Sequence, residues 1–192
     1  TKKNTGPAIL STALINDIPL NQPLIIFTAD HLIEKLSIFN KAIENNKKFL
    51  TDKNIFVFGI KPKNPSTEFG YFLTKRIGKI NKVKKFIEKP NLAKAIQIIK
   101  NKGYWNSGMF YLRKDSIINN FKIYRPSIYK KCLKAVSKAK YINKVYYLNK
   151  TWFSKSIAKS FDYAILEKTK DINAIKLDLP WSDLGNWREI SK

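Results

Sequence analysis

Two short apolar runs constrain the fold of this chain more than any other feature. Residues 24–27 read Leu-Ile-Ile-Phe, and residues 55–60 form a second apolar run. Such runs are typical of strands that are buried on both faces of a parallel sheet. Between them, residues 37–50 have the spacing of an amphipathic helix with Phe39 and Ile43 turned inward. The pattern predicts an α/β architecture, a mixed and mostly parallel sheet flanked by helices.

The rest of the chain continues this alternation and shows no internal repeat. Strands are expected at residues 71–76, 83–88, 104–113, 145–148 and 174–179. Helices are expected at residues 5–17, 91–99 and 155–167, with a further pair before residue 137. A short helix is also expected after Trp181. A length of 192 residues fits one domain of ordinary size.

The net charge of +23 has two explanations. A nucleic acid or another anionic surface could be the partner, and phosphate-rich substrates would also gain from a positive field. Alternatively, the charge reflects a general abundance of lysine, because lysine dominates whereas nucleic-acid readers favour arginine. We favour the second explanation and expect no specific nucleic acid. A basic nucleic-acid-binding module remains the non-enzyme alternative.

The single cysteine, Cys132, excludes an internal disulfide and is consistent with a reducing compartment. No signal peptide is visible, and the apolar runs are too short to span a bilayer. We therefore expect a cytoplasmic protein without a membrane partner, and a homo-oligomer remains open.

Three segments mix large aromatic residues with polar ones in a way that an ordinary core strand does not need. They are residues 86–90 (Phe-Ile-Glu-Lys-Pro), 105–110 (Trp-Asn-Ser-Gly-Met-Phe) and 181–187 (Trp-Ser-Asp-Leu-Gly-Asn-Trp). A pocket for a sugar phosphate needs this mixture. Carboxylates such as Glu88 and amides such as Asn106 bond hydroxyl groups, and the ammonium of Lys89 complements a phosphate. Trp105 and the apolar residues after Gly108 are expected to pack.

Asp30 and Asp183 each follow a predicted strand and begin a loop. Open α/β sheets bind ligands at the carboxyl ends of their strands. One or two carboxylates, together with substrate oxygens, suffice to hold Mg²⁺. Taken alone, each residue is more simply explained as a turn or capping aspartate.

These segments, in this order, resemble those of the mannose-1-phosphate guanylyltransferases, within the sugar-nucleotide pyrophosphorylase family. The resemblance runs from Asn4 to Trp187 and implies a nucleotide-diphospho-sugar transferase fold. It implies that Asp30 and Asp183 bind Mg²⁺ and, with Lys89, are catalytic. It also implies a set of residues that bind the sugar phosphate: Gly70, Glu88, Lys89, Asn106 and Asp162. For Asp162, a role in helix structure is the simpler alternative.

Residues 4–8, Asn-Thr-Gly-Pro-Ala, resemble the segment of this family that lies on the nucleotide side. The resemblance assigns nucleotide binding to Asn4, Gly6 and Pro7, with Gly6 in place of the usual alanine. An ordinary helix start is the alternative explanation. Near Asp30, His31 is expected to orient the loop rather than to transfer protons.

The Gly-rich phosphate loop of this family, Gly-Gly-x-Gly-x-Arg-Leu-x-Pro, has no counterpart in the sequence, which begins at Thr1. We therefore expect residues 1–192 to be a partial nucleotidyltransferase domain, its N-terminally truncated middle and C-terminal portion, inactive alone. The resemblance implies that the complete protein makes GDP-mannose and pyrophosphate from GTP and mannose 1-phosphate. Another sugar 1-phosphate is the alternative, and a following phosphomannose isomerase domain remains open.

Overall fold

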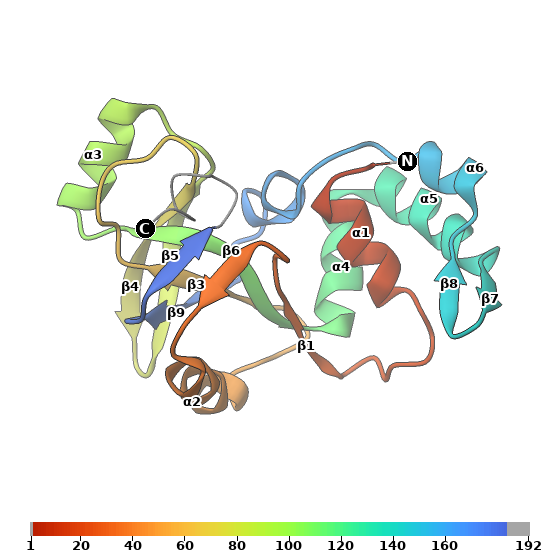
Figure 1. The fold of residues 1–192 in the computed structure, drawn as a ribbon, viewed down its shortest axis with the longest axis horizontal. Coiled ribbons are helices and arrows are strands. Elements are labelled where there is room, and N and C mark those ends of the chain that lie inside the picture. The colour runs from red at the N-terminus through yellow and green to blue at the C-terminus, as the bar shows by residue number, and fades with distance from the viewer. Residues whose placement is uncertain (1, 184–192) are drawn as a thin grey trace. The chain divides into compact units, whose positions relative to one another are not determined.

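The computed structural model describes residues 2–183, which form two compact units (Figure 1). The helical unit comprises Thr1–Pro23 and Arg113–Lys170, and the sheet unit comprises Leu24–Leu112 and Asp171–Lys192. The helix expected after Trp181 and the end of that segment, residues 184–187, lie outside the described residues. Within residues 2–183, no helix is both long enough and apolar enough to cross a bilayer.

A six-stranded sheet forms the centre of the sheet unit (Figure 1). In spatial order its strands are β1 (Pro23–Ile26), β6 (Tyr104–Arg113), β3 (Ile55–Ile60), β9 (Ile172–Leu177), β5 (Ile80–Ile87) and β4 (Gly70–Ile77). Strands β3 and β9 are parallel, whereas β3–β6, β4–β5, β4–β6 and β5–β9 are antiparallel. The sheet is mixed, as expected, but it has more antiparallel pairing than the sequence predicted. An apolar run indicates burial on both faces, and it does not fix the direction of the neighbouring strand.

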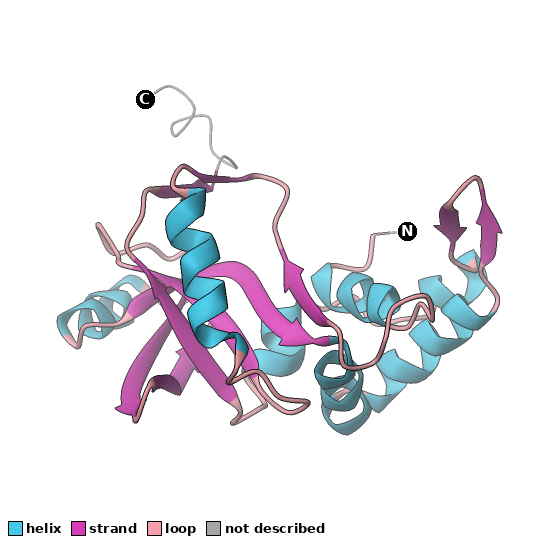
Figure 2. Cartoon of the chain, turned by 90° about the horizontal axis from the view of Figure 1, so that it is seen from below, coloured by secondary structure: helices cyan, strands magenta, loops and turns pink. Residues whose placement is uncertain are grey.

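Two helices pack against this sheet, α2 (Leu36–Lys47) and α3 (Leu92–Lys100). Figure 2 shows α2 lying across the strands. The Phe39 ring of α2 stacks on Phe58 of β3 with a centroid distance of 4.9 Å. Ile43 of α2 and Ile98 of α3 are buried in the same core. The prediction that Phe39 and Ile43 of α2 turn inward is therefore confirmed.

Strand β1 differs from the prediction of a strand buried on both faces. Its residues are only half-buried, and Phe27, which follows it, is 52% exposed. The reason is its place at the end of the described sheet order, where only β6 pairs with it. By contrast, all six residues of β3 are buried, as predicted.

A two-stranded antiparallel ribbon joins parts of the sheet unit that are far apart in sequence. It consists of β2 (His31–Ile33) and β10 (Trp181–Asp183). Both strands have three residues, too few for an alternating pattern to reveal them. The sequence predicted neither.

The helical unit contains α1 (Thr5–Ala13), α4 (Lys114–Tyr124), α5 (Pro126–Ser137), α6 (Lys150–Ser154) and the π-helical turn η1 (Asp162–Leu166). A hairpin of β7 (Lys140–Ile142) and β8 (Val145–Tyr147) lies between α5 and α6. Only β8 was predicted, and the paired helices α4 and α5 are confirmed.

The predicted helix at residues 155–167 is wrong for residues 155–160, and only its second half contains a helical turn, η1. The helical turn α6 begins earlier, where the Asn149 side chain accepts a hydrogen bond from the Trp152 N–H at 3.1 Å. After α6 the backbone pairs with α1: the Gly6 N–H donates to the Lys159 carbonyl at 3.0 Å, and the Phe161 N–H donates to Thr5 Oγ1 at 2.9 Å. Because this carbonyl and this N–H bond residues outside the segment, they cannot take part in the regular hydrogen bonds of a helix.

Candidate active site

Three of the residues assigned to the sugar phosphate meet at the ends of β4, β5 and β6. Gly70 lies opposite Asn106 in the β4–β6 pairing, and Glu88 directly follows β5. A Cβ atom added to Gly70 would lie 2.4 Å from Glu88 Oε2 and 3.4 Å from Asn106 Cβ. The missing side chain of Gly70 therefore makes the room that the Glu88 carboxylate occupies. The structure brings these three predicted residues together.

Asn106 and Gly108 connect this group to the loop that carries Asp30. Asn106 is buried, and its Oδ1 accepts a hydrogen bond from the Gly108 N–H at 3.3 Å. Gly108 has a φ of 74°, which favours glycine. A Cβ atom on Gly108 would lie 3.5 Å from Thr28 Cγ2 and 3.7 Å from His31 Cε1. The space beside Gly108 thus faces a neighbouring loop of the protein itself.

The β2–β10 ribbon brings the two candidate metal ligands to the same histidine. Asp183 lies opposite His31 in the register, and Asp30 immediately precedes β2. His31 Nε2 is 3.9 Å from Asp30 Oδ1. Burial lowers the pKa of His31, while the charges of Asp30 and Asp183 act in the opposite direction. Both carboxylates therefore lie close enough to act on one imidazole.

The Trp181 indole holds this histidine in place. Its N–H donates to His31 Nδ1 at 3.4 Å, and the two rings meet edge to face with centroids 5.1 Å apart. This hydrogen bond assigns the ring proton of the neutral imidazole to Nε2, the nitrogen that faces Asp30. The expectation that His31 orients the loop agrees with this geometry.

Three aromatic side chains that precede candidate site residues in the sequence pack against one another. The centroid distances are 5.0 Å for Phe69–Trp105, 5.5 Å for Phe69–Trp181 and 6.4 Å for Trp105–Trp181. Each aromatic residue stands one or two positions before a candidate site residue, namely Gly70, Asn106 or Asp183. The packing role expected for Trp105 is confirmed, since the side chain is 6% exposed. This aromatic group fixes the backbone from which the polar side chains project.

Lys89 is exposed and has a φ of 44°, a conformation that is unfavourable for a residue with a Cβ atom. Strained backbone of this kind is found more often at binding and catalytic sites than elsewhere. Pro90, which follows, is buried and begins the turn into α3. The strain at Lys89 is consistent with its predicted role.

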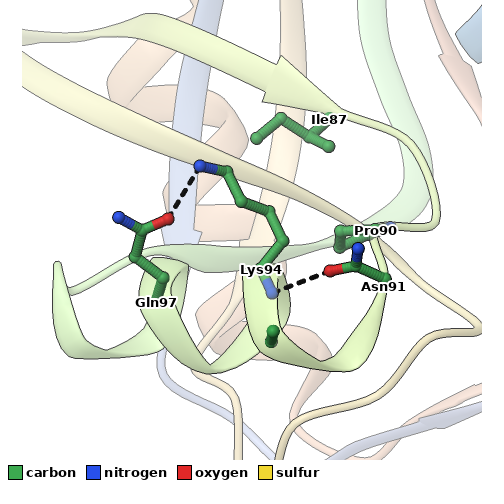
Figure 3. A pocket seen from close by; sticks show the side chains of 6 residues that line it. Ile87, Pro90, Asn91, Lys94 and Gln97 are labelled. Atoms are coloured by element: carbon green, nitrogen blue, oxygen red, sulfur yellow. Dashed lines mark hydrogen bonds between the residues drawn. The ribbon is translucent and has the colours of Figure 1, made fainter.

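A shallow depression of about 420 Å³ lies beyond Pro90, at the start of α3 (Figure 3). Its polar groups bond one another: Asn91 Oδ1 accepts from the Lys94 N–H at 2.9 Å, and Lys94 Nζ donates to Gln97 Oε1 at 2.7 Å. Asn91 thus caps the start of α3. None of the predicted site residues lines this depression.

The residues assigned to the nucleotide lie in the helical unit at the start of α1. The Asn4 side chain accepts a hydrogen bond from the Thr5 N–H at 2.8 Å. Gly6 and Pro7 are buried, and a Cβ atom on Gly6 would lie 2.6 Å from the Lys159 carbonyl oxygen. This contact explains why glycine stands where alanine was expected. Asp162 also belongs to this unit, at the first position of η1. The ligand roles of these four residues stay predictions.

The residues present fit Mg²⁺. Among residues 2–183 no three histidine, cysteine or acidic side chains converge as a closed metal cage. Mg²⁺ does not need one, since it is commonly held by one or two carboxylates and completed by substrate oxygens and water. The oxygen donors of Asp30 and Asp183, on either side of His31, match that requirement.

Thr28 is a candidate that the sequence did not single out. Its Oγ1 atom is buried and has no hydrogen-bond partner among the described residues. Since a buried hydroxyl without a partner is costly, this atom could bond a ligand. No sequence pattern indicates Thr28, because its hydroxyl becomes buried only when the loop that contains Thr28 packs against β6.

The chain is similar to curated proteins over nearly its whole length. The chain is 35% identical to mannose-1-phosphate guanylyltransferase of Escherichia coli, over 98% of this chain and 43% of the relative. It is 33% identical to the xanthan biosynthesis protein XanB of Xanthomonas campestris pv. campestris (strain B100), over 98% of this chain and 41% of the relative. The chain thus spans less than half the length of these curated relatives.

Among solved structures, the chain is similar to mannose-6-phosphate isomerase from Helicobacter pylori. The TM-score is 0.85 at 31% identity, and the match covers 95% of this chain and 72% of that chain. This likeness confirms the predicted α/β fold. A family model described as Nucleotidyl transferase matches residues 1–192, from the first residue to the last. The chain belongs to the nucleotidyl transferase family.

Proposed function

We propose that the protein transfers a guanylyl group from GTP to mannose 1-phosphate, giving GDP-mannose and pyrophosphate. The observation that carries this proposal is the convergence of Glu88 and Asn106 around Gly70. A carboxylate and an amide held at one point provide acceptors and a donor for neighbouring sugar hydroxyls. The name and 35% identity of the Escherichia coli relative support mannose 1-phosphate as the substrate.

In this reaction a phosphate oxygen of mannose 1-phosphate attacks the α-phosphorus of GTP. The bond from the α-phosphorus to the oxygen that bridges to the β-phosphorus breaks, and its electron pair leaves with pyrophosphate. The reaction consumes no oxidant or reductant. The task of the protein is to position the two phosphates and to stabilise the charge between them.

The side chains divide this task. Glu88 and Asn106 bind the sugar, and the exposed Lys89 pairs with the phosphate of mannose 1-phosphate. Asp30 and Asp183 would hold a divalent cation, for which we propose Mg²⁺. When bound, such a cation neutralises charge that develops on the attacked phosphate. The half-buried His31, fixed by Trp181, keeps the Asp30 loop in position.

We also propose that residues 1–192 are the middle and C-terminal portion of a nucleotidyltransferase domain. This proposal is supported by the sheet edge, where Phe27 is exposed and β1 is half-buried. A further strand beside β1 would cover both. At the start of α1, Asn4, Gly6 and Pro7 bind the nucleotide. For Asp162, the first residue of η1, we propose sugar-phosphate binding.

The test measures pyrophosphate release by the full-length protein with Mg²⁺ across a panel of nucleoside triphosphates and sugar 1-phosphates. We expect a clear preference for GTP with mannose 1-phosphate. A preference for glucose 1-phosphate with UTP or dTTP would overturn the choice of substrate. Isomerisation of mannose 6-phosphate, suggested by the Helicobacter pylori structure, is measured in the same samples. Isomerisation without pyrophosphate release would overturn the reaction itself.

A further inference from the structure

The positive charge of the chain is unevenly distributed. Residues 116–161 contain eleven lysine and arginine residues and no acidic residue, so all fourteen aspartates and glutamates lie elsewhere. A general abundance of lysine explains many basic residues, but it does not explain an interval without acidic ones. This part of the chain is therefore basic without any compensating acidic side chain.

This interval contributes most of α4, together with α5, the β7–β8 hairpin and α6, all in the helical unit, where α5 contacts both α4 and α6 (Figure 1). Three of its lysines surround the indole ring of Trp152: Lys131 Nζ lies 5.2 Å from the ring centroid, Lys134 Nζ 5.9 Å and Lys155 Nζ 4.9 Å. The ring face attracts each ammonium group. Three like charges at one ring still repel one another, and an anion bound among them would relieve that repulsion.

The hairpin that connects α5 to α6 exposes apolar side chains. Tyr141 is 59% exposed, Ile142 50%, Val145 48% and Tyr147 56%. Asn143 and Lys144, between the strands, have φ values of 49° and 62°, as in the tight two-residue turns of hairpins. Exposed apolar side chains that cluster at such a tip are unusual for a surface that faces only water.

The hairpin is held in place and does not hang freely from the unit. The Tyr146 O–H donates to the Asp17 carboxylate, and this bond raises the pKa of Tyr146 to about 12. The rings of Tyr141 and Tyr146 also lie 4.5 Å apart. An apolar tip that is already ordered loses little conformational entropy when it is buried.

We propose that the lysines around Trp152 and the apolar tip of the β7–β8 hairpin together bind an anionic lipid bilayer. The lysines around Trp152 pair with lipid phosphates, and Ile142 and Val145 enter the boundary between headgroups and acyl chains. Tyrosine and tryptophan are the residues enriched at this depth of a membrane. A nucleic acid fits less well, because the interval has a single arginine, Arg125, and the aliphatic tip has no counterpart on a phosphate backbone. The earlier expectation of no membrane partner rests on the lack of a spanning segment, and surface binding needs none.

The test is sedimentation of the full-length protein with vesicles of phosphatidylcholine alone or mixed with phosphatidylglycerol. We expect binding to the mixed vesicles only, weakened by salt. Because each lysine near an anionic surface contributes about fivefold in affinity, the triple variant Lys131→Gln, Lys134→Gln, Lys155→Gln should bind on the order of a hundredfold more weakly. The double variant Ile142→Ser, Val145→Ser should bind roughly tenfold more weakly, since it loses apolar burial.

A matched control lies on the other basic hairpin, β4–β5, where Ile77 is 58% exposed beside Arg76 and Lys79. Ile77→Ser should leave vesicle binding unchanged. Equal binding of all variants, or absence of binding to mixed vesicles, would overturn the proposal. So would duplex DNA that displaces the vesicles while the Ile142→Ser, Val145→Ser variant binds DNA normally, because that result assigns the surface to nucleic acid. None of these results depends on turnover of mannose 1-phosphate.

Discussion

The polar residues at the strand ends of the sheet unit and those at the start of α1 have different surroundings, although the sequence marks both alike. Glu88 and Asn106 meet around Gly70 on an aromatic support. Asn4 caps its own helix, and Gly6 lies against the Lys159 carbonyl. Strand ends from distant parts of the chain can combine side chains into one site. A helix start, by contrast, uses much of its polar capacity for its own N–H groups.

The largest expected effect lies in the sheet unit, at Asp183. Asp183→Asn in the full-length enzyme should keep the fold and lower kcat about a thousandfold, because a lost metal carboxylate removes several kcal/mol of charge stabilisation. Turnover with saturating Mg²⁺ is the measurement. Asp178→Asn, at an exposed position a few residues earlier, is the matched control and should be nearly silent. Equal kcat values for the two variants would remove Asp183 from the site.

Lys89→Ala should raise the KM for mannose 1-phosphate roughly tenfold to a hundredfold, since the lost partner is a phosphate charge. The KM for GTP should change little. Steady-state kinetics on Lys89→Ala and on Lys85→Ala, a control from β5, separate a specific contact from a general loss of positive field. An unchanged KM for the sugar phosphate in Lys89→Ala would contradict the assignment.

Gly70→Ala tests whether the strand ends act together. The new Cβ atom would lie 2.4 Å from Glu88 Oε2, so the carboxylate must move. We expect the KM for mannose 1-phosphate to rise about tenfold, a typical loss for one displaced hydrogen-bonding group. Gly78→Ala is the control: its φ of 56° makes the variant strained, but no atom lies within 4 Å of the added Cβ. It should lower stability and leave this KM unchanged.

Gly6→Ala should have the smallest effect on turnover and thereby sharpen the contrast between the two regions. A Cβ atom 2.6 Å from a backbone oxygen should lower the free energy of unfolding by about 1–3 kcal/mol. The KM for GTP should stay unchanged, because the close contact is with Lys159. Chemical denaturation and steady-state kinetics measure the two quantities. A raised KM for GTP at unchanged stability would show that the added methyl group enters the nucleotide site instead of meeting Lys159.

The sequence predicted most elements because their signals are local. The apolar run of β3, the inward face of α2 and the Asn91 cap of α3 each depend on residues within a few positions of one another. The first half of the predicted helix at residues 155–167 failed because its backbone bonds α1, about 150 residues earlier in the chain. A local pattern carries no information about such a partner.

For the candidate site, the sequence by itself determined the residue types: two aspartates, a Glu-Lys pair, an asparagine and glycines beside large aromatics. Only the tertiary structure decided which of them meet. Pairing of β2 with β10 sets Asp183 opposite His31, and pairing of β4 with β6 sets Gly70 opposite Asn106. Thr28 acquires its buried hydroxyl by the same kind of packing. The reason is physical, since three-residue strands have little preference of their own and form only where other strands supply their hydrogen bonds.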